Sequence, residues 1–104
     1  MRETVIMRDI IGDFGENKDL ARSVRQKNII PAIAQDSSIA LDFSGVNGAT
    51  QSFIHALIAE PNMRFREQAF DNLFYINAND DISEIISIVY RYLQESFIEM
   101  EETI

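Results

Sequence analysis

The spacing of apolar residues predicts one long helix near the end of the chain. From residue 82 onward, apolar side chains recur at i, i+3, i+4 and i+7, which is the period of one helix face. These positions are Ile82, Ile85, Ile86, Val89, Tyr90, Leu93 and Phe97. Asp81 and Glu84 have the spacing of a capping box, with Asp in place of the usual Ser or Thr. We therefore expect an amphipathic helix that begins near residue 81 and packs its stripe on the core.

Shorter apolar runs predict three strands. They cover residues 4–8, 39–43 and 73–76, and glycine, serine or asparagine follows each run closely. The first run could extend to residue 11, because the first glycine after it is Gly12.

The segments between these strands have helical signals. Residues 17–28 are polar, with apolar residues at helical spacing, and Pro31 then either kinks this helix or begins a new one in its first turn. Thr50 can cap a second helix, which we expect to end at residue 59 because Pro61 follows. Residues 64–69 are expected to be a short helical or irregular piece.

The alternation of strands and helices predicts an α/β fold. Such an order favours a mainly parallel sheet, here of about four strands, packed with helices and joined by right-handed crossovers. A length of 104 residues is enough for one domain, so we expect residues 1–104 to form a single domain. Sites in these sheets form where strands end and helices begin, and residues 44–50 have that position.

Composition narrows the possible partners and cofactors. The net charge is −8, so a phosphate backbone would be repelled and no nucleic acid is expected. The chain has no cysteine and one histidine, His55, so no metal or other cofactor is expected. No signal-peptide run and no apolar stretch of about 20 residues is present, so we expect a cytoplasmic protein without membrane contact.

The second predicted strand and the helix after it carry a resemblance to a known family. The sequence Leu-Asp-Phe-Ser-Gly-Val at 41–46, followed by Thr-Gln-Ser-Phe at 50–53, resembles the STAS-like domain family of bacteria. The segment Asp-Ile-Ile-Gly at 9–12 also fits this family. The family is a domain of unknown function related to anti-sigma-factor antagonists. The resemblance implies a STAS-like fold over the whole chain and a regulatory role without enzymatic activity.

Anti-sigma-factor antagonists carry Asp-Ser-Ser-Gly at the start of this helix, and a partner kinase phosphorylates the second serine. Matched by position, Thr50, Gln51, Ser52 and Phe53 occupy the motif, and Ser52 alone is retained. The resemblance therefore implies a protein partner, an ATP-binding kinase-like regulator such as a GHKL-type ATPase. The residues expected to contact it are Ser44, Gly45, Asn47, Gly48, Thr50, Gln51 and Ser52.

Two interpretations are open for Ser52. It is either a phosphosite, since a phosphate in the first turn of a helix is favoured by free N–H groups and the helix dipole, or a solvated hydroxyl. A homodimer is also possible, because Ile88 and Tyr92 extend the apolar surface of the last helix beyond one face.

Two other functions compete with a regulatory module. An antitoxin-like or defence-locus component would use its acidic surface to neutralise a basic partner, and salt would weaken that complex markedly. A small hydrolase or transferase would pair Ser52 with His55, three residues later on the same helix. It ranks last because no acid or metal accompanies the pair.

Overall fold

The computed structural model describes residues 2–102, with side chains up to residue 98. Three parallel strands form the main sheet in the order β1-β3-β5: β1 (Arg2–Ile6), β3 (Ser38–Asp42) and β5 (Leu73–Ile76). A second parallel pair joins β2 (Phe14–Gly15) to β4 (Gly48–Ala49). The predicted α/β fold with a parallel sheet is confirmed, with three strands plus two in place of about four.

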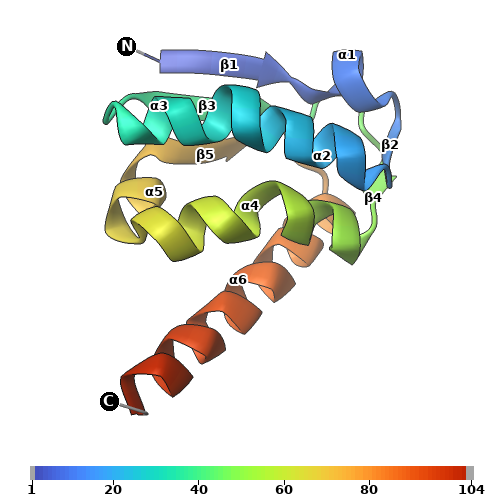
Figure 1. Cartoon of the computed structure of the whole chain (residues 1–104). Coiled ribbons are helices and arrows are strands. Elements are labelled where there is room, and N and C mark those ends of the chain that lie inside the picture. Colours follow the sequence, from blue (N-terminus) through green and yellow to red (C-terminus); the bar gives the residue numbers. More distant parts are fainter. Residues whose placement is uncertain (1, 103–104) are drawn as a thin grey trace.

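The helices are α1 (Met7–Ile11), α2 (Lys18–Val24), the π-helical turn η1 (Arg25–Ile29), α3 (Ile30–Ala34), α4 (Gln51–Phe65), α5 (Glu67–Asn72) and α6 (Asp80–Glu102). Helices α2, α3 and α4 lie on one face of the main sheet, and α1 lies at the carboxyl end of β1 (Figure 1). Helix α4 packs against α2 on one side and α6 on the other, and the far end of α6 projects beyond the rest of the domain (Figure 1). None of the described helices is both long enough and apolar enough to cross a bilayer.

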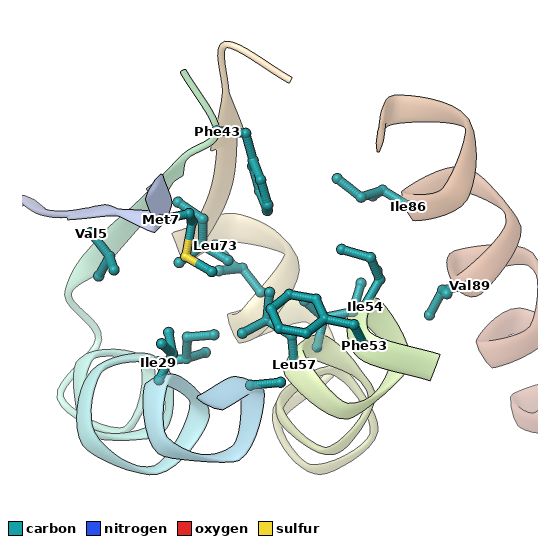
Figure 2. Close-up of a cluster of buried hydrophobic side chains, with 14 of the residues drawn as sticks. Val5, Met7, Ile29, Phe43, Phe53, Ile54, Leu57, Leu73, Ile86 and Val89 are labelled. Carbon is teal, nitrogen blue, oxygen red and sulfur yellow. The ribbon is translucent and has the colours of Figure 1, made fainter. Parts of the chain in front are cut away.

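The core lies between the central strand and α4. On β3, Ile39 and Leu41 are fully buried, and Phe53 and Leu57 of α4 are equally buried. Figure 2 shows Ile54 on the side of α4 that faces α6. Burying each of these side chains contributes about 1.5–3 kcal/mol, so α4 is the main link between the sheet and the last helix.

The first predicted strand is wrong at its end. The chain leaves the sheet after Ile6, and Met7 begins α1 instead of continuing a strand to residue 8 or 11. The reason is the register: Ile6 pairs with Asp42, the last residue of β3, so no strand lies beside the next residues. Met7 is instead fully buried in the core, and Gly12 N closes the short helix on Arg8 O at 2.9 Å.

Both prolines lie in helices. Pro31 occupies the first turn of α3, as one of the two alternatives predicted, and the π-turn before it connects α3 to α2 without a break. The predicted end of the next helix at residue 59 is wrong, because α4 continues through Pro61 to Phe65. Pro61 is buried, and Asn62 Nδ2 donates to Ile58 O at 2.8 Å inside the same helix. The stabilisation gained by burying this turn therefore outweighs the cost of the backbone hydrogen bond that proline cannot donate.

The last helix confirms the predicted stripe but not its cap. Ile82, Val89 and Leu93 are buried in the core. The cap is Asn79, whose Oδ1 accepts from Ile82 N at 2.9 Å, and the helix begins at Asp80. The capping box predicted at residues 81 and 84 is therefore two residues too late.

Candidate functional site

The seven residues predicted to contact a partner all lie on one segment, which we call the β3–α4 segment (residues 42–52). It leaves the carboxyl end of the central strand and enters the first turn of α4. Five of the seven are exposed, and Gly48 and Thr50 are half-buried. The fold thus presents a run of short polar side chains at the edge where parallel sheets commonly bind their ligands.

A carboxylate fixes the start of this segment. Asp42 Oδ1 accepts from Ser44 N at 2.9 Å and from Asn77 Nδ2 at 3.1 Å. The Ser44 N–H, followed by the Asn77 amide, lowers the pKa of Asp42 because both donors stabilise the charged form. Gly45 then turns the chain at φ +77°, a conformation that glycine adopts without steric cost.

Asn79 holds the middle of the segment. Its Nδ2 donates to Asn47 O at 2.8 Å, while its Oδ1 caps α6. Asn47 N donates in turn to Asp13 O at 2.7 Å. One asparagine therefore couples the position of the segment to the start of the last helix.

Thr50 holds the end of the segment. Its backbone N donates to Gly15 O at 2.8 Å, and its Oγ1 accepts from Phe53 N at 3.1 Å. The predicted N-cap is confirmed. Gln51 and Ser52 follow in the first turn of α4, and both side chains are exposed.

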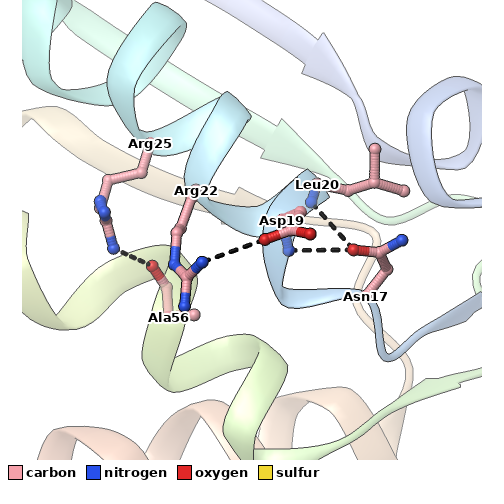
Figure 3. A network of polar contacts seen from close by, with 6 residues as sticks. All are labelled: Asn17, Asp19, Leu20, Arg22, Arg25 and Ala56. Carbon is pink, nitrogen blue, oxygen red and sulfur yellow. Dashed lines mark hydrogen bonds and ion pairs between the residues drawn. The ribbon is translucent and has the colours of Figure 1, made fainter.

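A cavity of about 600 Å³ opens beside Ser52. It lies between the helical segment α2–η1 and the start of α4 and is lined by Lys18, Arg22, Arg25, Gln51, Ser52, His55 and Ala56. Figure 3 shows the contacts on the α2 side of this cavity. Asn17 caps α2 by accepting from Asp19 N at 2.9 Å, and Arg22 Nη1 lies 3.0 Å from Asp19 Oδ1. Arg25 Nη1 reaches across to α4 and donates to Ala56 O at 2.9 Å.

The cavity brings Ser52 and His55 to one wall, as the spacing on α4 suggests. No hydrogen bond joins the two side chains in the described part of the chain, and no carboxylate lines the cavity. Within residues 2–98 no group of His, Asp or Glu is arranged to hold a metal ion. The geometry therefore supplies a polar, cation-lined cavity and lacks an acid to orient the histidine.

A separate apolar surface lies around α5 and α6. Phe70 is 75% exposed, and two cavities of about 490 Å³ each share Phe70, Tyr90 and Gln94 in their walls. Beneath them the Tyr75 and Tyr90 hydroxyls lie 2.7 Å apart. Burial, followed by the neighbouring Tyr90, raises the pKa of Tyr75 well above its usual value. Ile88 and Tyr92, the two residues expected to extend the apolar surface of the last helix, line neither cavity; Ile88 is half-buried and Tyr92 is 53% exposed.

A parallel sheet with helices on one face and a hydrogen-bonded segment leading into a capped helix defines a small α/β domain of STAS-like architecture. The comparison with protein families identifies it further. The model of the STAS-like domain of unknown function (DUF4325) matches residues 20–83, and the chain belongs to this family. The match includes the whole β3–α4 segment. Comparisons with curated proteins and with solved structures gave no match.

Sequence reasoning missed the side chains that surround the predicted site. Asn77 and Asn79 follow the third predicted strand, and an asparagine directly before a helical pattern is a common N-cap signal. Lys18, Arg22 and Arg25 lie 27–34 residues before Ser52, and nothing in the local pattern connects them to it. The available signal was only that the three cations recur at helical spacing along the predicted helix 17–28.

Proposed function

We propose that this chain is a cytoplasmic, non-enzymatic regulatory module that binds an ATP-binding, histidine-kinase-like protein through the β3–α4 segment. One observation carries the proposal: the segment exposes polar side chains while Asp42, Asn79 and Thr50 hold its backbone by hydrogen bonds. A surface held in place before binding loses little conformational entropy on binding, which favours protein recognition. The resemblance of the STAS-like family to anti-sigma-factor antagonists favours the same role.

The proposal is tested by a charge placed in the first turn of α4. Ser52→Glu adds a carboxylate at the centre of the proposed contact. Ser87→Glu adds the same charge at an exposed position of α6 and serves as the matched control. The full chain would capture its partner from the native host, and each variant would then be titrated with the ATP-binding protein recovered. We expect Ser52→Glu to weaken the complex about tenfold or more and Ser87→Glu to leave it unchanged. Equal affinity for the wild type and both variants would refute the proposed contact.

We also propose Ser52 as a phosphosite of this module. Its hydroxyl is exposed in the first turn of a 15-residue helix and lies at a cavity lined by cationic side chains. Both features favour a dianionic phosphate. Incubation with the captured partner and ATP, followed by mass spectrometry, should add one phosphate to the wild type and none to Ser52→Ala. A phosphate added equally to both proteins would place the modification elsewhere.

A second copy of the chain is the proposed partner for the apolar surface around Phe70. This exposed aromatic side chain lines one cavity together with Tyr90, Leu93 and Phe97, so a two-fold pair could place each Phe70 against the cavity of the other copy. The rim contains both signs of charge, with Arg66, Glu67 and Asp71, which suits self-pairing. Sedimentation of the full chain should show a dimer that Phe70→Ser dissociates.

The control for this dimer is Phe14→Ser, which removes a 46% exposed aromatic side chain from a different face. We expect this variant to remain dimeric. A wild type that is monomeric at all concentrations, or a dimer that survives Phe70→Ser, would refute the pairing.

A further inference from the structure

The cavity beside Ser52 concentrates positive charge on an acidic protein. The chain has 9 lysines and arginines against 17 acidic residues, yet three of those nine cations line this cavity. The single histidine lines it as well. Acidic side chains dominate the rest of the sequence and repel anions, whereas this cavity attracts them.

Arg25 is held in position to serve such a site. Its side chain is 18% exposed, and its Nη1 donates to Ala56 O at 2.9 Å. Its Nε is buried and lies 3.0 Å from Glu60 Oε2, but it forms no aligned hydrogen bond. A guanidinium has five N–H donors, so most of those on Arg25 are not used by the contacts described. The group is thus fixed at the cavity wall with donors to spare.

Lys18 and Arg22 form the outer part of the same wall. They lie four residues apart on α2 and therefore project from one helix face. Arg22 pairs with Asp19, but both side chains are largely exposed, so the pair is weak and can give way to a doubly charged ligand. Lys18 has no ion pair among the described side chains. Three cations and the two neighbouring carboxylates, Asp19 and Glu60, leave a local charge of about +1 before any charge on histidine.

The opposite wall supplies neutral donors. Gln51 and Ser52 offer an amide and a hydroxyl, and His55 adds a ring nitrogen from the next turn of α4. A phosphate monoester has three oxygens that accept from such donors together with lysine and arginine. The cavity volume of about 600 Å³ falls within the ~300–1,000 Å³ typical of small-molecule sites, and its lining is mainly polar. The chemistry therefore suits a small phosphorylated molecule and not an apolar ligand.

We propose that the cavity between α2–η1 and α4 binds the phosphate group of a small phosphomonoester. The proposal does not depend on the protein partner, since it rests on the cavity and its cations. It places a small-molecule site directly against Ser52, so that a bound ligand would lie at the edge of the β3–α4 segment.

The test is a titration of the full chain in which the backbone amide signals are monitored by NMR. Glucose 6-phosphate is the probe and glucose is the neutral comparison. Inorganic phosphate tests whether the phosphate group binds without a sugar attached. We expect saturable shifts at Ser52 and His55 with glucose 6-phosphate and phosphate, and none with glucose. The double variant Lys18→Gln/Arg22→Gln should weaken binding about tenfold or more, since each tenfold change corresponds to ~1.4 kcal/mol.

A matched variant distinguishes the loss of cations at this site from the loss of two positive charges elsewhere on the protein. Lys27→Gln/Arg91→Gln removes the same two charges at exposed positions that do not line the cavity, and we expect less than about a twofold change. Thermal melting of both variants checks that they fold. The proposal is overturned by the absence of saturation up to about 10 mM, by equal weakening in both variants, or by glucose binding as tightly as its phosphate.

Discussion

The Thr50→Ala substitution measures how much the N-cap of α4 contributes to the stability of the whole domain. The Thr50 hydroxyl accepts from Phe53 N at 3.1 Å, so alanine would leave that amide without its side-chain partner. Loss of such a cap costs about 1 kcal/mol, within a range of ~0.5–2. Because α4 links the sheet to α6, the cost should fall on global unfolding and not on local fraying. For a domain of this size, ~1 kcal/mol lowers Tm by roughly 4–8 °C.

The assay is urea unfolding of Thr50→Ala, Thr50→Ser and Ser52→Ala, with melting temperatures for the same proteins. Thr50→Ser keeps an accepting hydroxyl and should stay close to the wild type. Ser52 has an exposed hydroxyl with no hydrogen bond among the described contacts, so its alanine variant should stay within about 0.5 kcal/mol. Equal losses for Thr50→Ala and Ser52→Ala would refute the assignment of Thr50 as the cap and Ser52 as a free surface group.

Three further predictions concern polar groups elsewhere in the domain. The lowered pKa of Asp42 means that its contribution to stability is present above pH 3.8 and is lost as pH falls through the folded pKa, so Asp42→Asn should flatten acid unfolding curves in that range. The raised pKa of Tyr75 has the opposite sign: its contribution to stability is complete below pH 10.0 and is lost at higher pH. Tyr75→Phe should therefore reduce the loss of stability at alkaline pH, as measured by urea unfolding. Buried Asn72 donates to Asp36 Oδ1 at 3.0 Å and to a helix carbonyl, so Asn72→Ala should cost about 1–3 kcal/mol in urea unfolding, whereas Asp36→Asn should cost less.

The elements that the sequence predicts correctly are those with a clear pattern of apolar residues. The stripe of α6 is correct because its buried positions recur with the period of a helix. The strand at 73–76 is correct as an unbroken apolar run, although Leu73 is its one buried residue. The extent of α4 was not predictable, since Pro61 is an ordinary helix terminator and its tolerance depends on burial by distant elements. The end of β1 was equally hidden, because it is set by the length of its neighbour β3 and not by its own residues.

The candidate site also has a part that the sequence predicts and a part that it does not. Its exposed segment follows the central strand directly, so the sequence order of strand, glycine loop and capped helix was enough to predict its place. The hydrogen bonds that fix it come from Asp13, Gly15, Asn77 and Asn79, which are distant in sequence. The cations of the cavity are also distant. Local patterns therefore predicted which residues are exposed, but could not predict what surrounds them.

The closeness of Ser52 to the cationic cavity connects the two proposals. A negative group at position 52 would meet Lys18 and Arg22, which line the same cavity, and would compete with any free phosphate for those cations. Ser52→Glu should therefore weaken the binding of the protein partner and of glucose 6-phosphate together. Lys18→Gln/Arg22→Gln should weaken glucose 6-phosphate while leaving the hydrogen-bonded β3–α4 segment intact. If that double variant also loses the protein partner, the partner contact extends over α2; if it retains the partner, the segment alone forms the contact.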